Sequence, residues 1–516
     1  MNKPPPPLAR ALLAVAALLS LSLSGCAHVA APRLESRAPA ARDPIFARTL
    51  HEFQRRALQP QHMDTAAMVT AGIDELARSV PDLRAEPGDG GVVLSLRERT
   101  ARIAQGDTRQ SGAADIDAVA ARLDATVAWV AADAQAPALP ELQAAALRGA
   151  VRSADRWSTV VTGGARDGLM GRFQGTMSGI GCRVGRRDGA AIVLDVVPGA
   201  PAAMAGLQPG DRIVAVDDAE VTDLPISELV SRLQGAESSP VRVAVERGAE
   251  RLQYDLVRRR IVLSTVNSKM LARDVGYLQV THIAQNTGFQ AQKLIGGIRE
   301  SEPLRGLVLD LRGNSGGSMI AAGAIADQFL AGGVLIESRN GAGQPVPGLM
   351  HRIDATVDAE DLRPSGALVI LVDQGTGSSA ELLAAALSRH DRAVLIGQRT
   401  YGKGVLQQTV AMNADILLKV TVARSYAAGE AIPDDGLLPD VTLDPQAQGT
   451  DTRCSSDGWE RPGPVATWGT AGGAANADPA IVAALRLIDS YPAGSRRDVR
   501  RAVFLDSCTD TTKVGG

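Results

Sequence analysis

The sequence has little net charge, few aromatic residues and few groups that bind metals. Its 516 residues carry a formal net charge of −3 at pH 7, and only 3% of them are Phe, Trp or Tyr. Recognition of nucleic acid needs a basic surface, so this balance gives no indication of a nucleic-acid partner. The six histidines are scattered, and neither a C-x-x-C nor an H-E-x-x-H spacing occurs. The sequence therefore predicts no metal site.

Cysteine is also scarce, with four residues in a chain long enough for about two to four domains. Cys182 lies in a strand-like stretch and is expected to be a small buried hydrophobic residue. Cys454 and Cys508 lie far apart in a loop-rich tail. An oxidising compartment would allow these two to pair as a disulfide.

The N-terminus has the pattern of a targeting segment. A basic start is followed by an apolar run over residues 11–24, which is too short for a membrane-spanning helix. The run closes with Leu-Ser-Gly-Cys at Cys26, which resembles a bacterial lipobox; the alternative is an ordinary signal peptide with a chance cysteine. The resemblance implies a signal over residues 1–26, acyl chains on Cys26 and a periplasmic lipoprotein. Ala27 after the cysteine implies the outer rather than the inner membrane, and residues 27–44 are expected to be a tether.

The next part of the chain is predicted to be mostly helical over residues 45–165. Apolar residues recur at helical spacing over residues 66–79, 115–133 and 139–153. Residues 91–96 form one candidate strand.

A second unit spans residues 170–258 and alternates short strands with two short helices. Its run G-L-x-P-G-D-x-I-x-x-V-D, residues 206–217, resembles a PDZ domain. The G-x-G before it would otherwise suggest a nucleotide loop, but no helix follows. A PDZ domain accepts a peptide at a strand edge, and the family commonly has an arginine where this chain has Gln234. The resemblance implies that a terminal carboxylate binds the backbone N–H groups of Gly179, Ile180 and Gly181.

The stretch 367–408 has the strongest chemical pattern. The apolar run ALVILV at 367–372 predicts a buried strand, the loop 373–377 breaks the pattern, and helical spacing resumes after Ser378 and Ser379. A serine between a strand and a helix can be an N-cap. It can also be a nucleophile at a helix N-terminus, where negative charge is stabilised.

A second buried strand at 393–397 leads into the turn Thr-Tyr-Gly-Lys-Gly, in which glycines flank Lys403. Such a lysine is either a surface charge or, in a dry pocket, a base, because desolvation lowers its pKa and leaves the amine neutral. Gln407 follows by one helical or turn-like step and could orient this amine by a hydrogen bond.

These residues resemble the active-site segment of the C-terminal processing peptidases, a serine–lysine protease family. The resemblance implies that Ser378 is the nucleophile, Lys403 the general base and Gln407 the residue that orients the lysine; it implies no cofactor. The family's usual S-A-S-A-S-E reads TGSSAE here, so Ser379 is a rival for the nucleophile.

A glycine-rich turn at 312–317 follows a predicted strand and resembles the family's V-L-D-L-R-x-N-x-G-G. The simple interpretation is a strand-to-helix turn, shaped by Asp310, Arg312 and Asn314. The resemblance implies an oxyanion hole formed by backbone N–H groups of Gly316 or Gly317 and of Ser379.

The resemblance implies an α/β multidomain protein whose peptidase core, residues 261–445, has a ClpP/crotonase-like fold of ββα units. The tail, residues 446–516, has one predicted helix at 479–490 and no assigned role. The expected activity is serine endopeptidase action on proteins with apolar C-termini, with a homo-oligomer or an adaptor protein as further partners. The alternatives are a catalytically weak or inactive PDZ scaffold that binds partner C-termini, and a crotonase-type hydrolase, whose cofactor-binding signals are missing.

Overall fold

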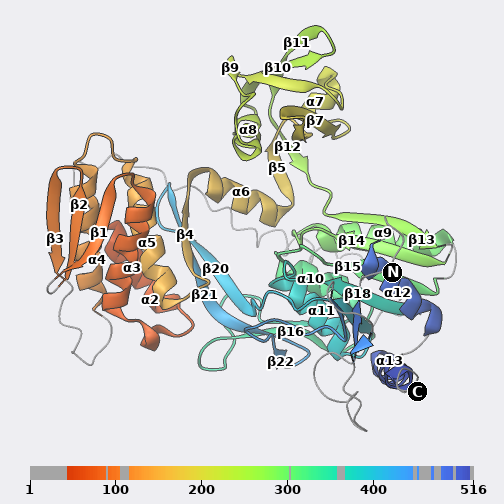
Figure 1. The fold of residues 1–516 in the computed structure, drawn as a ribbon. Coiled ribbons are helices and arrows are strands. Elements are labelled where there is room, and N and C mark those ends of the chain that lie inside the picture. The colour runs from red at the N-terminus through yellow and green to blue at the C-terminus, as the bar shows by residue number, and fades with distance from the viewer. Residues whose placement is uncertain are drawn as a thin grey trace, which may run out of the picture. The chain divides into compact units, whose positions relative to one another are not determined.

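The computed structural model in Figure 1 describes residues 44–88, 91–104, 115–272, 274–301, 304–356, 366–444, 450–451, 466–469, 478–491 and 495–511. The predicted signal peptide with Cys26 and the predicted tether, except for its last residue Pro44, therefore lie outside the described residues, and so does Cys454. Cys508 lies in a helix whose side chains are not described there. Within these ranges no helix has both the length and the apolar character that crossing a bilayer requires.

The first part of the described chain contains the helices expected from the apolar spacing. Two of them begin at aspartate N-caps, since Asp64 accepts from Ala66 N and Asp115 from Ala118 N. A three-stranded antiparallel meander, of which only the middle strand was predicted, accompanies them. The elements are α2 (Ile45–Arg56), η1 (Pro60–His62), α3 (Thr65–Ser79), β1 (Leu83–Gly88), β2 (Gly91–Leu96), β3 (Arg99–Ala104), α4 (Ile116–Ala131) and α5 (Leu139–Ala154).

A separate small sheet forms the predicted PDZ unit, with strand order β11-β10-β8-β7-β6 and β9 paired to β8. It has its own apolar core. Strand β6 lies at the edge of this sheet. The elements are β6 (Cys182–Arg187), β7 (Ala190–Val196), α7 (Pro201–Ala205), β8 (Arg212–Val216), β9 (Ala219–Glu220), α8 (Ile226–Leu233), β10 (Pro240–Arg247) and β11 (Glu250–Val257). Helix α6 (Gly163–Gln174) and the ribbon of β5 (Thr176–Gly179) with β12 (Arg259–Val262) flank the unit in sequence.

The largest sheet has the order β13-β14-β15-β18-β19-β23-β25-β24, and its strands from β14 to β25 are parallel. Buried parallel strands are apolar on both faces. In β18, Leu368 and Ile370 pack into one apolar cluster and Val369 and Leu371 into another. The strands are β13 (Val266–Ala272), β14 (Val275–Val280), β15 (Gly306–Asp310), β18 (Ala367–Val372), β19 (Ala393–Gly397), β23 (Val441–Asp444), β24 (Thr450–Asp451) and β25 (Ala466–Gly469).

Helices cover both faces of this sheet (Figure 1). Helices α9 (Thr287–Ser301), α10 (Met319–Asp327) and α11 (Ser379–Arg389) pack on one face. The other face is covered by α12 (Pro479–Ser490) and α13 (Arg496–Thr511) through Leu487, Ile488, Val499 and Val503. The tail for which the sequence indicated no role thus completes the core.

A second sheet, of order β17-β16-β21-β20, connects the core to the N-terminal helices. Strand β4 pairs with the start of β21, and the apolar cluster of the N-terminal helices includes Leu418, Val420 and Val422 of β21. The strands are β4 (Thr159–Thr162), β16 (Val334–Arg339), β17 (Arg352–Asp354), β20 (Val405–Ala411), β21 (Ile416–Ala427) and β22 (Glu430–Ala431), which pairs with β21.

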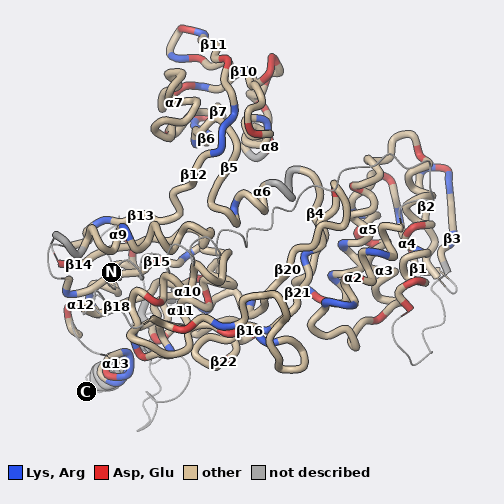
Figure 2. Tube along the Cα trace, turned by 180° about the vertical axis from the view of Figure 1, so that it is seen from behind, with Lys and Arg blue, Asp and Glu red and all other residues tan. Residues whose placement is uncertain are grey.

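Charged residues of both signs are interspersed along the N-terminal helices and the strands of the PDZ unit (Figure 2). Many pair locally, as Arg242 does with Asp218 and Asp255. Exposed pairs of this kind contribute about 0–1 kcal/mol each. The apolar clusters therefore supply the main stabilisation of the fold.

Candidate active site

Ser378 lies between strand β18 and helix α11, at the N-cap position, with φ 56° and ψ −123°. A serine in this region of backbone space is strained by about 1–3 kcal/mol. The sharp strand-to-helix turn of α/β hydrolases places its nucleophile in a similarly strained conformation. Ser378 is half-buried, whereas Ser379 is buried and its Oγ has no hydrogen-bond partner among the described residues. Of the two candidates, Ser378 has the accessible side chain.

Glu381 joins the serine turn to the lysine turn. Its fully buried carboxylate accepts hydrogen bonds from Ser378 N at 2.8 Å, Lys403 N at 2.9 Å, Gly402 N at 2.7 Å and Thr400 Oγ1 at 2.5 Å. A buried charge is tolerated when donors surround it in this way. The sequence carries a signal for this residue, because S-x-x-E before an apolar run is the signature of a capping box.

Lys403 is partly buried, and its pKa is lowered to about 8, mainly by burial and also by the positive charge of Lys419, while Asp155 and Glu381 oppose the shift. Its Nζ lies 5.4 Å from the centroid of the Trp157 ring. No hydrogen bond joins Lys403 Nζ to Ser378 Oγ in the described part of the chain. With a pKa of about 8, roughly a tenth of the Lys403 amine is neutral at pH 7, and this fraction can serve as a general base.

The sequence predicted a hydrogen bond from Gln407 to the lysine amine, but no such bond joins them among the described residues. Gln407 lies on strand β20, not one helical or turn-like step beyond the lysine, and its Nε2 donates to the Trp157 carbonyl at 2.6 Å. The register of β20 against β21 shifts at this residue, since Leu406 pairs with Ala423 and Gln407 with Thr421. Such bulges re-aim a side chain and occur often beside active sites.

The glycine turn lies directly against the serine turn. A Cβ on Gly316 would lie 2.8 Å from both Ser378 Cβ and Ser379 N, and one on Gly317 would lie 2.0 Å from Ile283 O, so only glycine fits at either position. Gly316 N donates to Asn314 Oδ1 at 2.9 Å. Within the described residues, the N–H groups of Gly317 and Ser379 have no acceptor, which leaves these two groups available to a substrate oxygen.

The three turn-shaping residues predicted from the sequence are held by hydrogen bonds. Arg312 bonds Asp310 and also Asp478, at 2.7 Å, and Asp478 caps helix α12. The Tyr277 hydroxyl donates to Asp310 at 2.7 Å, and burial together with this bond raises the pKa of Tyr277. The tail helix α12 therefore helps to hold the start of the glycine turn.

The predicted carboxylate-binding loop lies between β5 and β6. Gly179 ends β5, Ile180 is buried, and Gly181 has φ 80°, a conformation that favours glycine. The N–H groups of Ile180 and Gly181 have no acceptor among the residues that the structure describes. Cys182 next to them was predicted to be buried; it is half-buried against the apolar core of the unit, and burial raises the pKa of its thiol to about 11.

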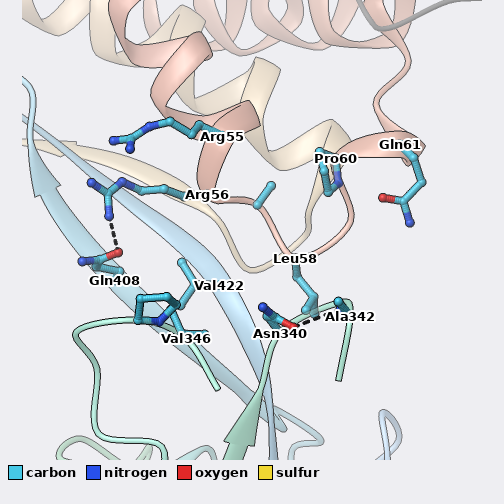
Figure 3. A pocket seen from close by; sticks show the side chains of 13 residues that line it. Arg55, Arg56, Leu58, Pro60, Gln61, Asn340, Ala342, Val346, Gln408 and Val422 are labelled. Atoms are coloured by element: carbon cyan, nitrogen blue, oxygen red, sulfur yellow. Dashed lines mark hydrogen bonds between the residues drawn. The ribbon is translucent and has the colours of Figure 1, made fainter. Parts of the chain in front are cut away.

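Two cavities lie beside the chain segment that connects α2 to α3. The larger, of about 620 Å³, is drawn in Figure 3, where Arg56 donates to Gln408 at 2.6 Å. The smaller, of about 220 Å³, is lined by Trp157, Phe53, Thr421 and Asp434 among others. Neither Ser378 nor Lys403 lines either cavity, but Trp157 lines the smaller one and contacts Lys403.

Comparison with known proteins agrees with this geometry. Residues 274–443 match the model described as peptidase family S41, and residues 192–247 match that of a PDZ domain. Residues 274–443 are called the S41 segment, after the family whose model they match. The S41 segment contains Ser378, Lys403, Gln407, Glu381 and both glycines of the turn. Trp157 and Asp478 lie outside it.

The chain is similar to proteins whose names describe processing of C-termini. It is 30% identical over 302 residues to the carboxy-terminal processing protease CtpA of Bacillus subtilis (strain 168), a match that covers 57% of this chain and 62% of that protein. It is 33% identical over 285 residues to the chloroplastic carboxyl-terminal-processing peptidase 2 of Arabidopsis thaliana, covering 52% of this chain and 54% of that protein. The chain thus spans 62% of the length of the first relative and 54% of the length of the second.

Among solved structures, the photosystem II D1 C-terminal processing protease is 28% identical, with 59% of this chain and 83% of that chain covered. The TM-score is 0.36, which is too low to support an argument about the fold.

Proposed function

We propose that this protein is a serine endopeptidase that cleaves proteins recognised by their C-terminal tails. One observation carries the proposal: the buried carboxylate of Glu381 accepts hydrogen bonds from the backbone N–H groups of both Ser378 and Lys403. It thereby joins a strained, accessible serine to a lysine whose pKa is lowered by burial. Both groups lie in the S41 segment, and the relatives named above are processing peptidases.

The proposed mechanism is acyl transfer by a serine–lysine pair. Neutral Lys403 takes the proton of Ser378 Oγ while the oxygen attacks the scissile carbonyl carbon. The carbonyl oxygen becomes an oxyanion and accepts hydrogen bonds from the N–H groups of Gly317 and Ser379. The Lys403 ammonium then gives its proton to the leaving amine, and a water molecule activated by the neutral lysine hydrolyses the ester on Ser378.

This mechanism requires Nζ to approach Oγ when substrate binds. Hydrogen bonds between catalytic groups often form only in the complex with substrate. Gln407 then acts on the lysine indirectly, through Trp157, whose carbonyl accepts its amide.

The PDZ unit is proposed to supply recognition. Free N–H groups at Ile180 and Gly181 suit a terminal carboxylate, and edge strand β6 suits the backbone of a peptide that extends the sheet. An apolar last residue would complete the ligand. The lipobox at Cys26 supports a periplasmic, membrane-anchored location, and the parallel sheet with helices on both faces supports a ClpP/crotonase-type core.

A catalytically inactive PDZ scaffold is the second candidate. It is favoured by the lack of a hydrogen bond between Ser378 and Lys403 in the described chain and by the bond of Gln407 to Trp157. Partner binding without proteolysis would distinguish it.

The test is hydrolysis of an unfolded protein with an apolar C-terminus by the purified mature protein. Ser378→Ala should abolish cleavage, and Ser379→Ala should retain part of it. A substrate of the same sequence with a charged last residue measures the contribution of tail recognition. Loss of activity only in Ser379→Ala would identify Ser379 as the nucleophile. A wild-type protein as inactive as Ser378→Ala would favour the scaffold.

A further inference from the structure

Trp157 contacts the S41 segment at two of its proposed catalytic residues, although it lies more than a hundred residues before that segment begins. Its ring centroid is 5.4 Å from Lys403 Nζ, and its carbonyl accepts the Gln407 amide at 2.6 Å. Its ring also packs edge-on against Tyr401, at 5.5 Å, in the same turn as Lys403. One residue of the N-terminal region therefore contacts three residues of the catalytic turn and the strand after it.

Building on the proposed serine–lysine mechanism, we propose that Trp157 is a positioning residue for the general base. The ring holds the lysine amine in a dry site, and the carbonyl holds Gln407. The N-terminal helical region thereby completes the active site of the peptidase core.

Trp157 is itself held by its neighbours in the connection between α5 and β4. The backbone N–H of Trp157 donates to Asp155 Oδ1 at 3.2 Å. Ser158 donates to the other oxygen of Asp155 and accepts from Thr421 N at 3.0 Å, which ties this connection to β21. The Arg156 guanidinium stacks 4.4 Å from the ring centroid. An indole fixed in this way provides a defined surface for the lysine amine.

The surroundings of Lys403 determine in which direction the pKa of its amine shifts when the Trp157 ring is removed. The charged groups that act on its amine are Lys419 on β21, which disfavours protonation, and Asp155 and Glu381, which favour it. Burial is the largest influence, and Trp157 both contacts the amine and lines a cavity of about 220 Å³. We therefore expect removal of the indole to extend this cavity towards the amine and to admit water. Hydration then favours the ammonium form.

The decisive experiment compares the pH dependence of kcat/KM for a peptide substrate between the wild-type protein, Trp157→Ala and Trp157→Phe. We expect the acid limb of Trp157→Ala to move up by about one pH unit, so that activity near pH 7 falls about tenfold and recovers at higher pH. Trp157→Phe keeps an aromatic face and should keep the wild-type limb. If Trp157 served only in folding, Trp157→Ala would lower kcat/KM equally at every pH and leave the acid limb at its wild-type pH.

Trp129 provides a matched control. It lies in α4 of the same region, with the Arg99 guanidinium 4.7 Å from its ring centroid and its carbonyl accepting from Arg99 at 2.8 Å. Trp129→Ala loses the same side chain and the same kind of cation contact, without any contact to Lys403, and should leave the acid limb unchanged.

A second measurement does not depend on catalysis. Acetic anhydride labels neutral amines, and mass spectrometry of the Lys403 peptide over a pH series gives the pKa of this lysine in each variant. Trp157→Ala should raise this pKa and Trp129→Ala should not. An unchanged value in folded Trp157→Ala overturns the positioning role, whereas an inactive wild-type protein with the expected labelling shift overturns only the proposed peptidase activity.

Discussion

Replacement of Glu381 by glutamine removes one charge and one acceptor oxygen at the point where the serine and lysine turns meet. Of its four hydrogen bonds, Ser378 N and Lys403 N use one oxygen, and Thr400 Oγ1 and Gly402 N use the other. The glutamine oxygen can replace the first, and its amide can donate to the Thr400 hydroxyl. The Gly402 N–H is then left buried without an acceptor.

The expected cost follows from these bonds. An orphaned buried N–H costs about 1–3 kcal/mol, and each of the two bonds that lose a charged acceptor weakens by about 1 kcal/mol. We therefore expect Glu381→Gln to lower the free energy of unfolding of the core by about 3–5 kcal/mol. Because the carboxylate also fixes both turns, peptide hydrolysis should fall more steeply than stability alone would explain.

Urea unfolding followed by circular dichroism measures the first effect, and hydrolysis well below the transition measures the second. Glu246→Gln is the control, because Glu246 forms an exposed pair with Arg212 and should change stability by less than about 1 kcal/mol. A Glu381→Gln protein as stable as this control would refute the reasoning, since its four donors would then not depend on the carboxylate.

Three further predictions concern the base, the tail and the anchor. Lys403→Met should stabilise the core at pH 7 by about 3 kcal/mol, because the pKa of Lys403 is lowered from 10.5 to about 8 and the folded state carries a desolvated ammonium below that pH. Between about pH 8 and pH 10.5 the unfolded chain binds more protons than the folded one, so wild-type stability should rise with pH over this range. The stability difference between Lys403→Met and the wild type should therefore vanish above about pH 10.5. A stability difference that does not change with pH in chemical unfolding would contradict this prediction. Asp478→Asn should lower kcat more than it raises KM, because Arg312 loses a partner that holds the glycine turn, and kinetics identical to wild type would show that the turn does not need the tail. Cys26→Ser should release the protein from the membrane fraction and abolish palmitate labelling, and equal labelling of both proteins would exclude this cysteine.

Much of the fold was predictable because its core strands and helices follow simple apolar patterns. Residues 367–372 and 393–397 are continuous apolar runs, and both are buried strands. Strands β1 and β3 carry proline, arginine and alanine in no alternating pattern, so they gave no comparable signal. Helix α13 has a largely charged sequence and packs through few apolar residues, of which Val499 and Val503 are two.

The site was predictable at its separate residues but not in its connections. A motif resemblance identifies Ser378 and Lys403, yet the acceptor of the Gln407 amide is a backbone carbonyl that lies 250 residues earlier in the chain. Backbone groups have no signature in the sequence. The role of Glu381 likewise depends on donors from a turn 19 to 22 residues later, which only the folded chain brings to it.

The cover of the core sheet by α12 and α13 has a consequence for how the chain is made. During synthesis the N-terminal parts of a protein emerge and begin to fold first. Until residues 479–503 have emerged, one face of the sheet, with Val308, Val369 and Ile396, has no partner, and Arg312 lacks Asp478. The glycine turn beside Ser378 thus receives this support only after residues 478–503 have been made, so a chain that ends before them cannot hold the proposed active site in its folded form.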